Sequence, residues 1–74
     1  MDRRALGGRI RNARTRAKLT QLDVAHALGT QASTVSKWEA GLWEPSLSFV
    51  DALARTLKVR LEWLVRGPRS RKAA

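Results

Sequence analysis

Apolar residues recur along this chain at intervals of three or four positions, which is the spacing of amphipathic α-helices. In the first segment, Asp2 can cap a helix whose apolar face carries Leu6, Ile10, Ala13 and Ala17. No stretch alternates apolar and polar positions with β-branched residues, so the pattern predicts no strands. The fold class indicated is all-α.

A second helix is indicated by Thr20 and Asp23, which have the spacing of a capping box. This helix runs to about Leu28 and buries Val24, Ala25 and Leu28. The next helical pattern begins after only three residues, GTQ. So short a connection forces the two helices to cross steeply.

A third helix is predicted from about residue 32 to residue 40, after Gly29, which can take the left-handed conformation that ends a helix. Val35 and Trp38 face inward, and Gly41 ends this helix as well. The outward face is small and polar, with Ala32, Ser33, Ser36 and Lys37. Two helices joined by a short glycine-containing turn describe a helix-turn-helix, and so slim a second helix can enter a DNA major groove about 12 Å wide.

Two further helices complete the predicted five-helix bundle. Ser46 can cap the fourth, whose apolar stripe consists of Leu47, Val50, Leu53, Ala54 and Leu57. Residues 61–65 form one more short turn, closed by Gly67 and Pro68. We therefore expect one DNA-binding domain over residues 1–67, followed at 68–74 by a basic disordered tail or the start of a linker.

Charge is concentrated at the two ends of the chain. The net charge is +9, with seven basic residues and one acidic residue in positions 1–18 and four more basic residues in positions 66–72. Positions 19–65 hold four basic and five acidic residues. This distribution favours a polyanionic partner, nucleic acid first, although arginines that only solubilise a small domain remain an alternative.

The sequence offers no set of residues for catalysis or metal binding. It contains no cysteine, its only histidine is His26, and its six acidic residues are scattered. We therefore expect no enzyme activity, no metal and no cofactor. No apolar run approaches the roughly 18 residues of a membrane span, and the N-terminus lacks a secretory signal, so we expect a cytoplasmic protein with no membrane partner.

Five motifs together carry a resemblance to a known family: RIRNAR, LTQLDVAHALG, STVSKWEAG, EPSL and LEWLVRG. Residues 6–67 resemble the Cro/phage-repressor type of helix-turn-helix, the xenobiotic-response-element family. The resemblance implies a lambda-repressor-like bundle of five helices from a bacterium or phage. It also implies a homodimer that binds a pseudo-palindromic operator in double-stranded DNA and regulates transcription, as a repressor in the first instance.

Position by position, the resemblance implies base reading by residues at the start of the third helix and one turn later: Gln31, Ala32, Ser33 and Lys37. It implies phosphate contacts by Thr20 and Gln21. Thr34 and Ser36 are expected to contact phosphate or to pack, and Arg11 of the first helix is expected to contact phosphate as well. Two positions depart from the family pattern. Gln31 is a poor cap, so Thr30 can cap the third helix instead, and Arg60 stands where a capping serine is usual.

Glu39 lies in the last turn of the third helix, where the helix dipole disfavours an anion. The resemblance implies that Arg14 supplies the compensating cation as a structural brace; the alternative is an exposed pair. Trp63 either plugs the end of the bundle or joins Leu61 and Leu64 in a dimer patch. Trp43 can cover the core, contact sugar-phosphate or dock a partner, and covering the core is preferred.

An alternative function keeps this fold but makes protein binding the main task. In that case the chain is an antitoxin-like module that sequesters a toxin and also autoregulates its own promoter. A third possibility is that the chain is the DNA-binding part of a larger regulator. Binding to an anionic membrane through the first helix is disfavoured, because the apolar face of that helix is needed for the core.

Overall fold

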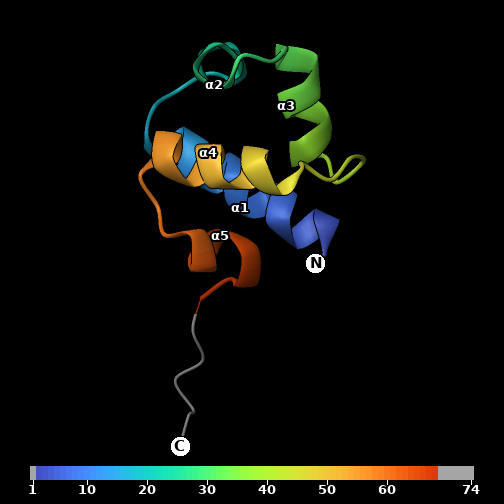
Figure 1. Cartoon of the computed structure of the whole chain (residues 1–74), viewed down its shortest axis with the longest axis vertical. Coiled ribbons are helices and arrows are strands. Elements are labelled where there is room, and N and C mark those ends of the chain that lie inside the picture. Colours follow the sequence, from blue (N-terminus) through green and yellow to red (C-terminus); the bar gives the residue numbers. More distant parts are fainter. Residues whose placement is uncertain (1, 69–74) are drawn as a thin grey trace, which may run out of the picture.

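The computed structural model describes residues 2–68, and this part of the chain forms five α-helices and no strands (Figure 1). The helices are α1 Arg3–Arg16, α2 Gln21–Leu28, α3 Ala32–Glu39, α4 Leu47–Leu57 and α5 Leu61–Arg66. The predicted all-α bundle of five helices is confirmed. The basic tail predicted for residues 68–74 lies outside the described residues except for Pro68.

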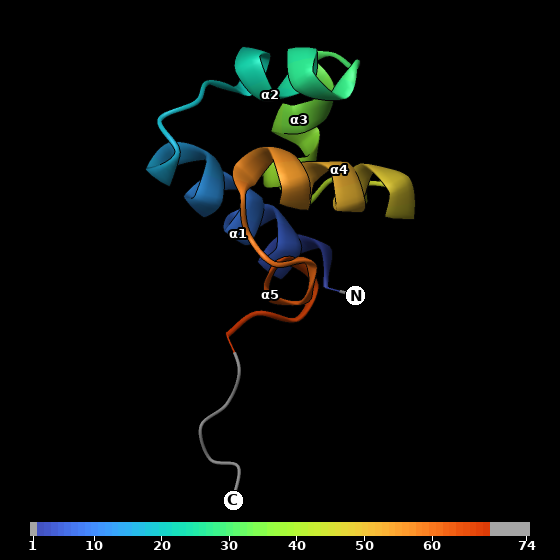
Figure 2. The same cartoon turned by 60° about the vertical axis from the view of Figure 1, so that its left-hand side comes forward.

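The helices α1 and α4 occupy the middle of the molecule, with α2 and α3 at one end and α5 at the other (Figures 1 and 2). Helix α1 contacts α3, α4 and α5, while α2 packs against α3 and α4. The helix-turn-helix is therefore mounted on the two central helices, and α5 lies away from it.

Local capping fixes where three of the helices begin, and in α4 the Ser46 side chain accepts a hydrogen bond from the backbone N–H of Phe49 at 3.3 Å. The Asp2 side chain accepts hydrogen bonds from the backbone N–H groups of Arg4 and Ala5, at 3.0 and 3.3 Å. Thr20 and Asp23 form the reciprocal capping box of α2, at 2.8 and 3.0 Å. These contacts satisfy N–H groups that have no partner inside a helix, as the sequence predicted.

Helices α3 and α5 begin without a side-chain cap. Gln31 and Arg60 are their N-cap residues, and neither side chain bonds to a backbone N–H of its helix. Thr30 does not replace Gln31, because α3 begins at Ala32. The position of α3 therefore depends on packing and on side chains from other helices.

The core is built from the apolar faces of all five helices. Its buried members are Leu6, Ile10, Ala13, Val24, Ala25, Val35, Trp38, Val50, Leu53, Ala54, Leu57 and Leu64.

Two core predictions are wrong. Ala17 is exposed because α1 ends at the preceding residue. Leu47 is 77 % exposed because it is the first residue of α4, and Phe49 packs against Trp38 instead, with ring centroids 5.1 Å apart.

Gly7 allows α1 and α3 to approach each other closely. It is buried, and a Cβ atom at this position would overlap the backbone carbonyl oxygens of Trp38 and Glu39. Any larger residue would push the end of α3 away from α1.

Arg9 fixes α5 to α1. Its Nε donates to the carbonyl of Leu64 at 2.7 Å, and its Nη2 donates to the carbonyl of Val65 at 2.8 Å. The guanidinium thus binds carbonyls at the negative end of the α5 dipole. In the sequence Arg9 is one of the seven basic residues of positions 1–18, and no local pattern indicates this contact.

Candidate nucleic-acid interface

The turn between α2 and α3 depends on a left-handed glycine. Gly29 has a φ of +70° and ends α2, with its N–H directed at the carbonyls of Ala25 and His26. Thr30 N–H bonds to the carbonyl of Ala25 at 2.9 Å, which closes the turn. Because only three residues separate the two helices, α3 presents one face outward (Figure 1).

The outward face of α3 carries small polar side chains. Gln31, Ser33 and Ser36 are exposed, whereas Thr34 is half-buried. Ala32 is also half-buried and packs against the core, so it projects less than the sequence predicted. The exposed surface at the start of α3 therefore consists of one amide and one hydroxyl, both able to donate and accept hydrogen bonds.

Lys37 is held by the segment that follows α3. Its Nζ lies over the ring of Trp43, 4.5 Å from the centroid, in a cation–π contact. The backbone N–H groups of Leu42 and Trp43 both donate to the Lys37 carbonyl, at 3.0 and 3.3 Å. Trp43 is 51 % exposed, so the prediction that it covers the core is wrong.

A charged cluster behind α3 joins α1, α2 and α3. Arg14 donates to both carboxylate oxygens of Glu39, from Nε at 2.6 Å and from Nη2 at 3.0 Å. Its Nη1 also donates to the carbonyl of Leu19 at 3.0 Å, in the segment before α2. The side chains of Arg14 and Glu39 are only 13 % and 4 % exposed. Hydrogen bonding to Glu39 raises the pKa of Arg14 further, so the guanidinium stays protonated.

Gln21 belongs to the same cluster, a contact that the sequence does not indicate. Its Nε2 donates to Glu39 Oε1 at 3.0 Å. One N–H of the amide is therefore engaged inside the protein, and Gln21 retains its second amide N–H, its carboxamide oxygen and the backbone N–H at the start of α2 for an outside ligand.

Three of the predicted phosphate-binding residues come together in one hollow between α1, α2 and α3. Arg11, Gln21 and Ser36 line it, with Arg14 and Glu39 beneath. Because Arg14 neutralises Glu39, the unpaired charge at this hollow is that of Arg11. Thr20 and Thr34 do not line the hollow. Thr20 is exposed and directly precedes Gln21 in the chain, and its side-chain oxygen accepts the hydrogen bond that caps α2.

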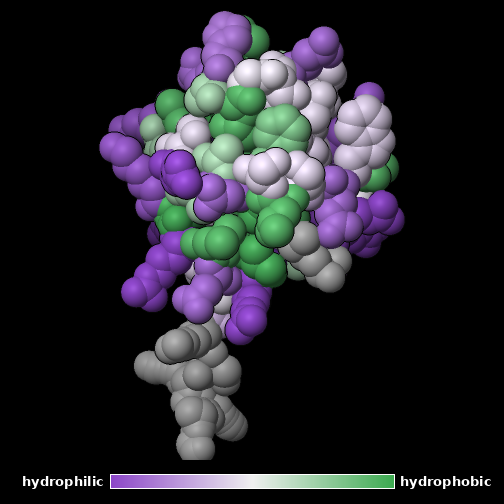
Figure 3. Space-filling model, in the orientation of Figure 1, coloured by the Kyte–Doolittle hydropathy of each residue, from purple (hydrophilic) through white to green (hydrophobic). Residues whose placement is uncertain are grey.

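The predicted dimer patch is only partly at the surface. Leu61 is 40 % exposed and Trp63 is half-buried, but Leu64 is fully buried in the core. The inclusion of Leu64 is therefore wrong. Figure 3 shows hydrophobic surface gathered around α5, with hydrophilic side chains around it.

Neither a membrane span nor a metal site is found within residues 2–68. No helix there is long and apolar enough to cross a membrane. No three histidine or acidic residues there gather into a group that could hold a metal ion.

Known proteins of similar sequence include a family of helix-turn-helix proteins and a transcriptional regulator. The profile of a family described as "Helix-turn-helix" matches residues 10–64. The HTH-type transcriptional regulator DicA of Escherichia coli (strain K12) is 37 % identical over 62 residues. That match covers 84 % of this chain but only 46 % of DicA, so the chain spans about half the length of this relative.

Two solved structures share the fold. The P22 c2 repressor protein in complex with a synthetic operator superimposes with a TM-score of 0.81 at 28 % identity, covering 85 % of this chain and 96 % of the repressor chain. The restriction-modification controller protein C.AhdI from Aeromonas hydrophila gives a TM-score of 0.80 at 32 % identity, covering 85 % and 91 %. The lambda-repressor-like architecture expected from the sequence is thereby confirmed.

Proposed function

The chain belongs to the helix-turn-helix family, and on this premise we propose that it binds double-stranded DNA in a sequence-specific manner and regulates transcription. The single observation that supports this most strongly is the outward face of α3. It is narrow and uncharged at its start, and the Arg14–Glu39 pair fixes it from behind. One of the structural relatives is a repressor bound to an operator, which supports the same conclusion.

In this proposal α3 enters the major groove and reads base edges. Gln31 and Ser33 hydrogen-bond to bases, Ala32 contacts a thymine methyl group, and Lys37 donates to guanine. The half-buried position of Ala32 restricts it to van der Waals contact. Trp43 holds the Lys37 ammonium and thereby limits which base that ammonium can reach.

Phosphate contacts orient α3 and carry no sequence information themselves. We assign the hollow lined by Arg11, Gln21 and Ser36 to one phosphate, with Arg11 supplying the charge. Thr20, which is exposed at the start of α2, and Thr34 complete the set. The N-terminus of α2 adds backbone N–H groups that favour an anion.

The protein acts as a homodimer in this proposal, through the exposed parts of Leu61 and Trp63. Because α5 lies away from α2 and α3, a contact through α5 leaves the helix-turn-helix free (Figure 2). A two-fold dimer would place the α3 helices about 34–36 Å apart and would read half-sites one helical turn apart. Such a regulator would work in the bacterial cytoplasm, at the nucleoid, and residues 1–67 would be its DNA-binding domain.

The antitoxin-like alternative has no comparable support. The relatives reported above are named as a transcriptional regulator, a repressor and a controller protein. These names also favour the expectation of a protein without enzyme activity.

Selection of binding sites from a random duplex library tests the proposal. We expect enrichment of a two-fold-symmetric sequence. The matched control is the Ser33→Ala variant taken through the same selection, which should lose the preference at the base that Ser33 reads and keep the rest. Recovery of no common sequence by the unaltered chain would contradict the proposal.

A further inference from the structure

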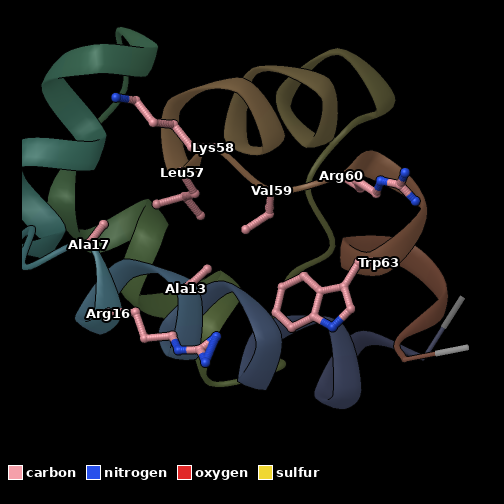
Figure 4. A pocket seen from close by; sticks show the side chains of 8 residues that line it. All are labelled: Ala13, Arg16, Ala17, Leu57, Lys58, Val59, Arg60 and Trp63. Atoms are coloured by element: carbon pink, nitrogen blue, oxygen red, sulfur yellow. The ribbon is translucent and has the colours of Figure 1, made fainter.

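Packing alone does not fix the orientation of α5 on the rest of the molecule. The helix has six residues and begins without a side-chain cap, so it is too short to be stable by itself. Of residues 61–66, Leu64 is the one buried side chain. A cleft of about 660 Å³ lies between the start of α5 and the ends of α1 and α4 (Figure 4). The start of α5 is therefore not close-packed against the two central helices.

The other end of α5 is held by Arg9 of α1. Its Nε and Nη2 donate to the carbonyls of Leu64 and Val65, at 2.7 and 2.8 Å. Hydrophobic burial has no preferred direction, whereas a pair of hydrogen bonds from one planar guanidinium is satisfied only in a narrow range of orientations. These two bonds therefore fix the angle at which α5 crosses α1.

Gly67 leaves the space that the Arg9 guanidinium occupies. Its φ is +87°, and a Cβ atom at this position would lie 3.1 Å from Arg9 Nη1. A side chain at position 67 would strain the backbone and would also displace the guanidinium. Two residues far apart in the chain are thus matched to each other at the end of α5.

We propose that Arg9 is a positioning residue that sets the spacing between the two half-sites of the operator. This inference rests on the proposed dimer contact through Leu61 and Trp63, which makes α5 the element that joins the two copies. Two α3 helices about 34–36 Å apart each lie roughly 17 Å from the two-fold axis. A rotation of α5 by about 10° would move each α3 helix by about 3 Å, which is close to the rise of one base pair.

Duplexes with altered spacing test this inference. They carry the selected operator with its two half-sites moved one base pair closer together or further apart, and a further duplex carries a single half-site. In fluorescence anisotropy, we expect the unaltered chain to bind the selected spacing at least about tenfold more tightly than either altered spacing. Arg9→Gln should reduce this preference to about threefold or less. It should still bind every duplex with two half-sites more tightly than the single half-site, because Leu61 and Trp63 are unchanged.

Three further variants separate the hydrogen bonds from the charge. Arg3→Gln is the matched control, because it removes the same charge from an exposed position of α1, and its spacing preference should stay within about twofold of that of the unaltered chain. Arg9→Lys keeps the charge but loses the planar pair of donors, so it should behave like Arg9→Gln. Gly67→Ala keeps Arg9 but displaces its guanidinium, and should also reduce the preference. Unchanged binding to the single half-site shows that each variant is folded.

The possible contrary results have different meanings. An Arg9→Gln variant with the full spacing preference would overturn the inference and leave the dimer intact. An Arg9→Gln variant that binds two half-sites no better than one would also overturn it, because Arg9 would then be needed to form the dimer and not to set its spacing. Full preference in Arg9→Lys would show that charge suffices without the two bonds. An unaltered chain without any spacing preference would contradict the proposed homodimer, and the inference with it.

Discussion

Trp43 determines where the charge of Lys37 is located. We expect loss of the contact between them to change the affinity for DNA measurably. A cation–π contact at an exposed site contributes about 0.5–1 kcal/mol. We therefore expect Trp43→Ala to weaken binding to the selected operator about two- to fivefold, and Trp43→Phe to retain most of the affinity. Fluorescence anisotropy with a labelled duplex provides the measurement.

The Lys37→Ala background shows whether Trp43 acts through Lys37. If it does, Trp43→Ala has no further effect once Lys37 is absent, because the two residues then form one coupled unit. An equal loss of affinity in both backgrounds would mean that Trp43 contacts DNA itself.

The ion pair between Arg14 and Glu39 should contribute strongly to stability, because both side chains are largely buried. Arg14→Ala leaves the Glu39 carboxylate with only the Gln21 amide, and we expect it to lower the free energy of unfolding by about 3–5 kcal/mol. Arg55→Ala is the matched control, since it breaks an exposed pair with Asp51 and should cost under about 1 kcal/mol. Urea denaturation followed by tryptophan fluorescence measures both; equal losses would show that the pair behaves as a surface contact.

Contacts between residues far apart in the chain could not be predicted from local sequence patterns. Arg9 binds carbonyls 55 and 56 positions away, and no local pattern distinguishes it from the exposed arginines of the same helix. Trp43 was recognised as lying outside any periodic face, but its position over Lys37 depends on the loop conformation after α3. The Arg14–Glu39 pair was expected only from family resemblance.

The packing of α3 against α1 requires a glycine at position 7 and not at position 8. A Cβ at Gly7 would lie 2.7 Å from the Glu39 carbonyl oxygen, whereas a Cβ at Gly8 would meet nothing within 4 Å. We expect Gly7→Ala to reduce stability by about 1–3 kcal/mol or more and to weaken operator binding, because α3 is displaced. Gly8→Ala should instead stabilise the exposed helix position by about 0.5–1 kcal/mol. Thermal unfolding of the two variants tests this, and the account fails if both have the same effect.

The start of α2 should respond to pH through Asp23. Hydrogen bonds from the backbone and side chain of Thr20 lower the pKa of Asp23. The ionised carboxylate therefore stabilises the folded state at pH values above its unfolded pKa of about 3.9, and this contribution is lost as the pH falls through the lower folded value. The difference in unfolding free energy between the unaltered chain and Asp23→Ala should be constant above about pH 5 and should shrink toward pH 2.5. A difference independent of pH would contradict the capping box.

The local sequence was enough to predict which residues form each helix, but not how the helices contact one another. Caps such as Ser46 and periodic positions such as Val50 and Leu53 depend on neighbours within one or two turns, and they were predicted correctly. Errors occurred at helix ends, where one residue changes a side chain from buried to exposed. Ala17 lies just after the end of α1, and Leu47 lies at the start of α4. In α5, Leu64 is buried and Leu61 is exposed. Which side of α5 is buried could be known only from the position of α1.

At the scale of the whole molecule, the proposed function separates the charge that would bind phosphate from the surface that would read bases. Most basic residues lie in the first 18 positions and after position 65, while the start of α3 is uncharged. This division lets electrostatic attraction provide affinity and short polar side chains provide specificity. Non-specific binding should therefore weaken steeply as salt rises, and specific binding should retain a preference for one sequence.

The most direct test of the account is the ratio of affinities for the selected operator and for a scrambled duplex, measured by anisotropy at one physiological salt concentration. We predict a ratio of at least about 10³ for the unaltered chain. We predict that Ser33→Ala and Lys37→Ala each reduce operator binding at least about tenfold, while Ser33→Ala leaves binding to the scrambled duplex unchanged. A ratio near one, or a Ser33→Ala variant that loses both affinities equally, would contradict the claim that α3 reads DNA sequence.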